Sequence, residues 1–280
     1  MINIPELTFH DGHTAPQLGF GVWQIDNDIL PGVVSTALDL GYRSVDTAAV
    51  YENERGVGQG LRESDVPRED VFVTTKVWNT DHGHEATRRA FEASLKRLDL
   101  DYVDLYLIHW PVPKINQYVQ AWETMIQLRD EGLARSIGVC NFNINHLQTL
   151  LDQTGVLPVV NQVELHLQFQ QQALRDFHHE NNIVTEAWSP LGQGLLWQHP
   201  TLHELASKHD RSVAQIMLRW HIQLGNMVIP KSVTPSRLAE NLQLFDFELD
   251  DNDMAKLLAM DQPDGRTGPD PELFRLPKQS

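Results

Sequence analysis

Short apolar runs alternate with helical patterns along most of this chain, after an opening segment of another kind. The opening segment, L-T-F-H-D-G-H-T, alternates around Asp11-Gly12, a pair typical of a type I′ turn, and predicts a β-hairpin that plugs one end of the fold. Eight later runs have the length and composition of strands, at residues 18–21, 43–47, 71–76, 102–109, 136–139, 159–164, 184–188 and 227–229.

Helical patterns lie between these runs. One extends from Asp28 to Leu40 and ends at Gly41, and another, from Thr87 to Leu98, carries its apolar residues on one face. Eight strands with interleaved helices predict a parallel (β/α)8 barrel, the α/β fold known as the TIM barrel. Such barrels commonly use about 250 residues as one domain, so we expect residues 1–280 to form a single domain.

The end of the chain exceeds what eight strand and helix units need. Asp250 to Met260 has the pattern of an extra amphipathic helix, and a tail rich in Pro and Gly follows it to Ser280. The pattern alone leaves two interpretations of this tail: an ordered loop or a frayed terminus.

Polar residues stand at the ends of three successive predicted strands. Asp46, Lys76 and His109 each close an apolar run, and Tyr51 follows five residues after Asp46. Active sites of barrels lie at the carboxyl ends of the strands, so polar residues that gather there more often serve catalysis than packing. Each residue alone would more often be structural, but their convergence favours catalysis.

These four residues fit a proton transfer. Tyrosine loses its proton near pH ~10, so a tyrosine that acts as a general acid at neutral pH needs a cation beside it to stabilise the phenolate. Lys76 is the candidate to lower the pKa of Tyr51, and Asp46 would keep Lys76 charged in a dry pocket. His109 is placed to hydrogen-bond a reacting oxygen.

Five segments, three of which contain these residues, resemble the aldo-keto reductase family, and most closely its bacterial 2,5-diketo-D-gluconate reductase A group. They are G-Y-R-S-V-D-T-A-A-V-Y-E-N-E, T-T-K-V-W-N, Y-V-D-L-Y-L-I-H-W-P, G-V-C-N-F and V-I-P-K-S-V-T-P-S-R-L-A-E-N. The resemblance extends from residue 18 to residue 270. It implies a monomeric enzyme that reduces small aldehydes and ketones to alcohols, with a tail that folds over the barrel mouth. The resemblance implies 2,5-diketo-D-gluconate as the substrate, reduced to 2-keto-L-gulonate, and methylglyoxal and β-keto esters as further substrates.

Net charge and cysteine content limit the ligands and the cellular compartment that this chain suits. The formal net charge of −16 argues against binding to nucleic acid or to an anionic membrane, so an anionic ligand would need a local basic pocket. The single cysteine, Cys140, excludes an internal disulfide and fits a reducing compartment. The first residues lack the features of a signal peptide, and no apolar run approaches the ~20 residues of a membrane span, so we expect a cytoplasmic protein.

If Tyr51 protonates an oxygen, a cofactor must add hydride to the carbon, and no flavin or metal motif is evident. Neither Gly19 and Gly21 nor the G-V-G-Q-G segment of residues 56–60 has the dinucleotide fingerprint, which favours packing or turn roles for these glycines. Phosphate recognition is better placed in the loop after the eighth strand, which contains Lys231, Ser232, Val233, Thr234 and Arg237.

Thr234 suits a helix N-cap and Pro235 a first helical residue, so free backbone N–H groups would point toward this loop. Basic and hydroxyl groups gathered in so acidic a chain suggest a 2′-phosphate, and hence NADPH rather than NADH.

The resemblance assigns further cofactor residues. It places the adenosine end on Lys231, Ser232, Arg237, Glu240 and Asn241, the nicotinamide carboxamide on Asn141 and Gln162, the nicotinamide ring on Trp188, and the pyrophosphate on Ser189, Leu191, Gly192 and Gln193. Two positions depart from the family pattern. Cys140, a weak donor, stands where many members have a hydrogen-bonding serine, and Leu167 stands where many have proline.

Three tryptophans lie just past strand ends. Trp23, Trp78 and Trp110, with His109, would form the wall of a pocket for small, partly apolar carbonyl compounds. Phe142 and Phe274 are weaker candidates for the same wall.

Other classes fit less well. No tyrosine has a lysine four residues later, as short-chain dehydrogenases require, and His203-Glu204 is followed by Ser207 rather than by the histidine of H-E-x-x-H, so no metal site is expected. The remaining rival is an NADPH-binding regulatory or sensor module with little turnover, because some barrels of the family serve as subunits of membrane channels. The complete set of four polar residues favours turnover.

Overall fold

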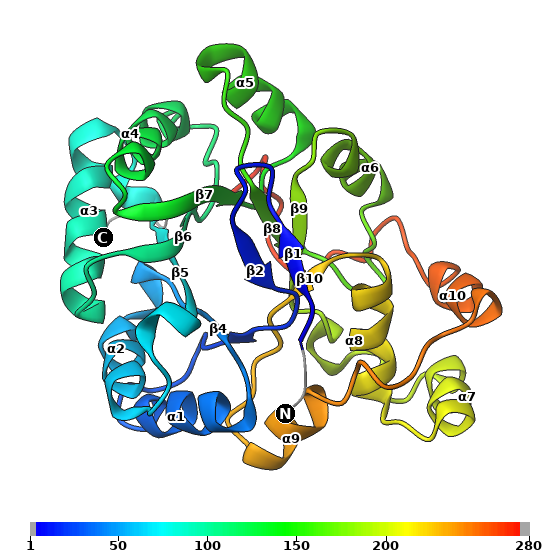
Figure 1. The fold of residues 1–280 in the computed structure, drawn as a ribbon. Coiled ribbons are helices and arrows are strands. Elements are labelled where there is room, and N and C mark those ends of the chain that lie inside the picture. The colour runs from blue at the N-terminus through cyan, green and yellow to red at the C-terminus, as the bar shows by residue number, and fades with distance from the viewer. Residues whose placement is uncertain (1–3, 275–280) are drawn as a thin grey trace, which may run out of the picture.

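The computed structural model describes residues 4–274, in which eight parallel strands form one sheet with neighbours in chain order. The sheet closes, because Leu18 and Val228 form a parallel bridge between the first and last strands and the Gly19 N–H donates to the Val228 carbonyl. The predicted (β/α)8 barrel is confirmed, with helices around the outside (Figure 1). The strands are β3 (Phe20–Gly21), β4 (Ser44–Asp46), β5 (Phe72–Val77), β6 (Val103–Ile108), β7 (Ala134–Cys140), β8 (Val160–Glu164), β9 (Val184–Trp188) and β10 (Met227–Val228).

The helices that surround the barrel bury one apolar face each against the strands. Both helices predicted between strands are present, and the first ends as expected, at Gly41 with a left-handed φ of 114°. The helices of the ring are α1 (Leu30–Leu40), α2 (Glu54–Glu63), α3 (His84–Leu98), α4 (Tyr118–Asp130), α5 (Ile144–Thr154), α6 (Gln172–Glu180), α7 (Pro200–His209), α8 (Val213–Gln223) and α9 (Pro235–Asn241).

The glycines of α2 serve close packing, as the sequence predicts. A Cβ on Gly58 would lie 1.9 Å from the Leu98 carbonyl oxygen, and one on Gly60 would lie 2.6 Å from the Val34 Cβ. The helix α2 therefore lies closer to α1 and α3 than a side chain at these positions would permit.

The predicted hairpin is present, but its turn is of another type. Strands β1 (Glu6–Thr8) and β2 (Thr14–Pro16) pair antiparallel, and the Phe9 N–H donates to the His13 carbonyl. Gly12 has a φ of 92° whereas Asp11 is not left-handed, so the turn is not type I′, which needs a positive φ at both central residues. The five-residue connection closes with a single left-handed glycine instead.

The hairpin closes one end of the barrel, as expected. Phe9 and Ala15 share a buried cluster with Leu105 and Leu107 of β6 and Met227 of β10. In Figure 1 the hairpin crosses the end of the barrel nearest the viewer.

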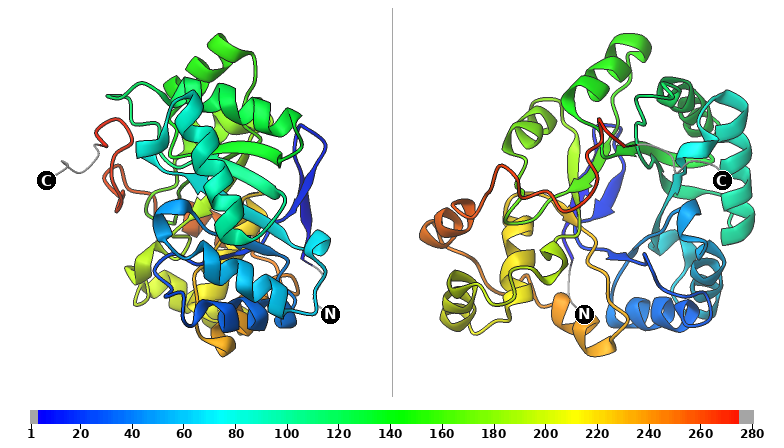
Figure 2. Two further views of the ribbon diagram at one scale, coloured as in Figure 1. Left: turned by 90° about the vertical axis from the view of Figure 1, so that its left-hand side faces the viewer. Right: turned by 180° about the vertical axis from the view of Figure 1, so that it is seen from behind.

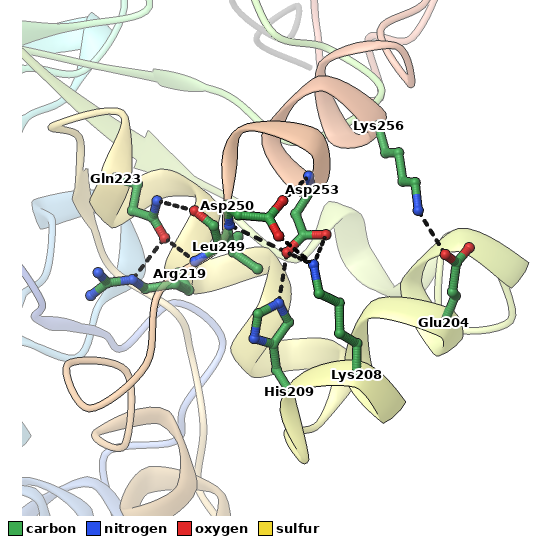
Figure 3. A network of polar contacts seen from close by, with 9 residues as sticks. All are labelled: Glu204, Lys208, His209, Arg219, Gln223, Leu249, Asp250, Asp253 and Lys256. Atoms are coloured by element: carbon green, nitrogen blue, oxygen red, sulfur yellow. Dashed lines mark hydrogen bonds and ion pairs between the residues drawn. The ribbon is translucent and has the colours of Figure 1, made fainter.

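The extra helix α10 (Asp251–Leu258) is attached to α7 by charged groups (Figure 3). Lys208 Nζ donates to Asp250 and to the fully buried carboxylate of Asp253, and His209 lies 2.7 Å from the same carboxylate. From α10, residues 261–274 return across the end of the barrel opposite the hairpin (Figure 2). The interpretation as a frayed terminus is therefore wrong for these residues, and the rest of the tail lies outside the described residues.

Within residues 4–274, no helix is both long enough and apolar enough to span a membrane.

Candidate active site

A cavity of about 540 Å³ lies at the carboxyl ends of the strands, beneath the tail. It brings together residues from strand ends far apart in the sequence, as the barrel geometry requires. Those singled out from the sequence that line it are Trp23, Asp46, Tyr51, Trp78, His109, Trp110, Asn141, Gln162, Trp188, Ser189, Gln193 and Lys231.

Lys76 and Asp46 form a buried ion pair at the floor of this site. Lys76 Nζ lies 2.5 Å from Asp46 Oδ1 and donates to the Thr47 carbonyl at 2.9 Å, and the lysine is fully buried. Burial is the largest single influence on Lys76 and lowers its pKa. Asp46 and Tyr51 together outweigh burial and raise the pKa above its ordinary value. Lys76 is therefore charged at neutral pH, in agreement with the sequence analysis.

Tyr51 ends a 3-10 turn, Ala49–Tyr51, that follows β4 and brings the phenol over Lys76. Lys76 Nζ lies 5.1 Å from the centre of the Tyr51 ring. Burial raises the pKa of Tyr51 to about 12, because it outweighs the lowering by Lys76, while Asp46 also raises it. The expected net lowering is thus wrong for the protein without ligands: Lys76 acts in the expected direction but does not prevail.

His109 follows β6 and lies edge-on to both Tyr51 and Trp78, with ring centres 5.7 and 5.1 Å apart. Burial, and then the charge of Lys76, hold the pKa of His109 well below its ordinary value. The imidazole is therefore neutral, and its Nδ1 has no hydrogen-bond partner among the residues described.

Two amide side chains connect the strand ends. Asn141, held with a φ of 61° just after β7, accepts from Trp188 Nε1 at 2.8 Å and donates to the His109 carbonyl at 3.0 Å. Gln162 Nε2 donates to Asp46 Oδ2 and to Glu186 Oε2, each at 2.8 Å. These bonds fix the orientation of both amides and of the Trp188 ring.

Cys140 is placed differently from the other candidates. Its thiol is fully buried, contacts Gln162 Oε1 at 3.8 Å and does not line the cavity. Leu191 and Gly192 also lie outside the lining, Leu191 against the core and Gly192 against His166.

The loop after β10 presents two cations to solvent. Lys231 and Arg237 are exposed, and neither forms an ion pair within residues 4–274. Thr234 is the N-cap residue of α9 and Pro235 its first residue, as predicted, although the Thr234 side chain accepts no capping bond. The Ser232 hydroxyl accepts from the Thr234 N–H, whereas Val233 is exposed, Glu240 half-buried and Asn241 buried.

Aromatic side chains form the cavity wall. Trp23, Trp78 and Trp110 all line it, and Phe274 stacks on Trp110 with ring centres 4.4 Å apart and planes 9° from parallel. Phe142 does not belong to the wall. It is fully buried between Tyr118 and His146, because the chain turns its side chain behind β7 into the core.

The sequence analysis missed Glu164, one of the residues that hold the tail. Glu164 Oε1 accepts from the N–H and the hydroxyl of Thr267 at 2.6 and 2.5 Å, and Oε2 accepts from the Gly268 N–H at 2.9 Å. A Cβ on Gly268 would lie 2.6 Å from the Trp188 ring, so the tail touches that indole directly. The available signal was an acidic residue that closes β8, as Asp46 closes β4.

No group of three or more His, Cys, Asp or Glu side chains is arranged to hold a metal ion in the described part of the chain.

Known proteins resemble this chain along nearly its whole length. Methylglyoxal reductase DkgA of Escherichia coli K12 is 51% identical over 276 residues, which cover 98% of this chain and 99% of that protein. An aldo-keto reductase of Mycolicibacterium smegmatis is 51% identical over 272 residues, covering 97% of this chain and 98% of that protein. The crystal structure of a mutant of Gox0644 in complex with NADPH is 49% identical, with a TM-score of 0.95 over 98% of this chain and 100% of that one.

The sequence model described as the Aldo/keto reductase family matches residues 17–262. This range includes all eight strands of the barrel and the four polar residues at its mouth. The chain belongs to the aldo/keto reductase family and is an oxidoreductase.

Proposed function

We propose that this protein reduces small aldehydes and ketones to alcohols with NADPH, and that Tyr51 donates the proton. The observation that carries the proposal is the buried Lys76–Asp46 pair directly beneath the Tyr51 phenol, at the floor of a cavity walled by tryptophans. A buried ion pair adds little net stability, because the cost of desolvating both charges offsets their attraction, so stability alone gives no reason for it. It suits a phenol that becomes negatively charged during a reaction.

The described residues fit NADPH at both ends. Asn141, Gln162 and Trp188 at the cavity would hold the nicotinamide, and Lys231 and Arg237 near the N-terminus of α9 are cations without a partner in the described chain, as a phosphate site requires. The NADPH-bound structure of the 49% identical neighbour supports the same cofactor. When bound, NADPH supplies the hydride that reduces the carbonyl carbon.

The side chains of the site would then manage the proton and the oxygen. Because its pKa is about 12, Tyr51 is protonated at neutral pH and can donate its O–H proton to the carbonyl oxygen. The charge of Lys76 stabilises the phenolate that remains. The neutral imidazole of His109 can donate one N–H to the same oxygen and orient it.

We propose methylglyoxal and 2,5-diketo-D-gluconate as the substrates to test first, with β-keto esters as a further class. The name of the 51% identical Escherichia coli relative supports methylglyoxal. Trp78 and Trp110 would contact the apolar part of the substrate, and His109 its carbonyl oxygen. We propose further that the chain acts as a single-domain monomer in the cytoplasm, where a lone buried thiol such as that of Cys140 stays reduced.

The test is NADPH oxidation by the purified protein with methylglyoxal, 2,5-diketo-D-gluconate, an aryl aldehyde and a β-keto ester. We expect turnover with at least one of them, and kcat/KM ranks the substrates. Binding of NADPH without reduction of any would contradict the proposal and favour a sensor. A separate run on a size-exclusion column with light scattering checks the monomer.

A further inference from the structure

Glu186 is a buried carboxylate that the mechanism above does not use. It lies on β9, is 1% exposed, and accepts from Gln162 Nε2 through Oε2. The same nitrogen donates to Asp46 Oδ2, so its two hydrogens are both taken by carboxylates. In the described chain, the only contact of Gln162 Oε1 is the long one, at 3.8 Å, with the Cys140 thiol. This oxygen can therefore accept a hydrogen bond from a ligand in the cavity.

The buried cluster holds two carboxylates but one cation. Lys76 is the only cation paired with Asp46 in the described chain, and the remaining neighbours carry no charge that would balance Glu186. With both carboxylates ionised the cluster has a net charge of −1, and with one proton bound it is neutral. Inside the barrel, the groups around Glu186 come from five other strands: Asp46 of β4, Lys76 of β5, Cys140 of β7, Gln162 of β8 and Met227 of β10. Outside the barrel, His178 of α6 is hydrogen-bonded to Thr185, the residue before Glu186.

We propose that Glu186 is a positioning residue of this active site: through Gln162 it fixes the amide that faces the cavity, and its ionisation sets the net charge of the buried cluster that it forms with Asp46 and Lys76. Its kinetic consequence rests on the proposed function. Burial is the largest influence on Glu186 and raises its pKa to about 7, and the charge of Asp46 acts in the same direction. Glu186 therefore changes its charge near neutral pH.

The direction of the effect on reduction follows from the charge that forms on Tyr51. A phenolate is less costly above a neutral cluster than above a cluster of charge −1. Reduction should then be faster when Glu186 is protonated and slower as the pH rises through its pKa.

The experiment compares wild type with Glu186→Gln, which keeps the acceptor for Gln162 and removes the charge. In the wild type we expect kcat for reduction to fall about tenfold between about pH 6 and about pH 9, since one pKa unit corresponds to a factor of ten. In E186Q this fall should be absent. Glu180→Gln, an exposed glutamate at the end of α6, is the matched control and should retain the wild-type profile. An unchanged profile in E186Q would overturn the proposal.

A second measurement needs no turnover. The pKa of Glu186 is raised in the folded state, so its contribution to stability is present below about pH 4.5 and is lost as the pH rises through about 7. The Tm of E186Q minus that of the wild type should therefore increase as the pH rises from 5 to 8, measured at intervals of about one pH unit.

If the wild type reduces nothing, the proposed function is wrong, while a Tm difference that does not depend on pH would overturn the inference about Glu186. Should E186Q not fold, Glu186→Asp keeps the carboxylate but shortens it away from Gln162: a weaker NADPH affinity by tryptophan fluorescence supports the positioning role, and an unchanged affinity contradicts it.

Discussion

Lys76 and Tyr51 are buried together, and opposing influences set the pKa of each. Burial is the largest influence on both groups and disfavours both the charged lysine and the phenolate. For Lys76 the nearby negative charge of Asp46 prevails, whereas for Tyr51 burial prevails over the attraction of Lys76. At neutral pH the lysine is thus charged and the phenol protonated, the two states that a proton donor and its supporting cation need.

Removal of Lys76 alone should be costly for stability. Lys76→Met leaves Asp46 without its cation in the buried cluster, and breaking a buried ion pair costs about 3–5 kcal/mol in the free energy of unfolding. Urea denaturation at pH 7 measures this. The double variant Asp46→Asn, Lys76→Met should lose less than the sum of the two single variants, because it leaves no unpaired carboxylate at position 46. Additive losses would mean that the pair does not interact as described.

At the scale of elements, the Glu164 carboxylate is one of several groups that hold the tail, together with Glu272, which accepts from Asn143 and Asn145. Burial alone would raise the pKa of Glu164. Hydrogen bonds from His166, Thr267 and Gly268 outweigh it and lower the pKa to about 2. A depressed carboxyl pKa means that this contact stabilises the fold above about pH 4.5 and is lost as the pH falls toward 2. At neutral pH the contact is fully formed and keeps the tail over the cavity.

Glu164→Gln should loosen the tail. The amide places an N–H where the carboxylate now accepts from Thr267 and Gly268, so at least one of those bonds is lost. We expect hydrogen exchange at the Thr267 and Gly268 amides to speed up by about tenfold, which corresponds to ~1.4 kcal/mol. The surface variant Glu180→Gln serves as the control. Exchange that stays at the wild-type rate in E164Q would show that other contacts hold the tail.

At the scale of the whole molecule, a net charge of −16 repels an anionic cofactor. Lys231 and Arg237, exposed beside the start of α9, therefore have to supply attraction locally. Because both are exposed, salt should screen their effect.

Lys231→Ala and Arg237→Ala should each weaken NADPH binding by about tenfold or more, since a hydrogen bond to a charged group is worth about 1.5–3 kcal/mol. The Kd for NADH, which lacks the 2′-phosphate, should change little, and the difference should shrink at high salt. Lys96→Ala, an exposed lysine on α3, is the control. Equal losses for NADH and NADPH would place these cations elsewhere than at the 2′-phosphate.

The sequence predicts the barrel because the periodicity of buried strands is local information, and the eight strand positions follow from it. The convergence of Asp46, Tyr51 and His109 at one cavity also follows, since the carboxyl ends of parallel strands meet at one end of a barrel. Quantities that depend on packing do not follow. The side chain of Phe142 turns into the core, and the depth of burial that raises the pKa of Tyr51 requires the assembled fold.

The contacts of Glu164 with the tail illustrate the same limit. They join residues 103 positions apart in the chain, and nothing local in the tail indicates where it lies. Likewise, the sequence alone does not pair Glu186 with Asp46, because Gln162 connects them only when three strands of the barrel are in register.

The most direct test of the account is the rate of hydride transfer to methylglyoxal in Tyr51→Phe, measured by stopped flow with saturating NADPH. The account predicts a fall of about 10²–10⁴-fold, the usual contribution of a general acid, with the Kd for NADPH unchanged. Tyr102→Phe is the matched control, because that ring lies between Arg68 and Arg135 at the start of β6, at the other end of the barrel. A Tyr51→Phe protein that transfers hydride at the wild-type rate would contradict the assignment of Tyr51 as the proton donor.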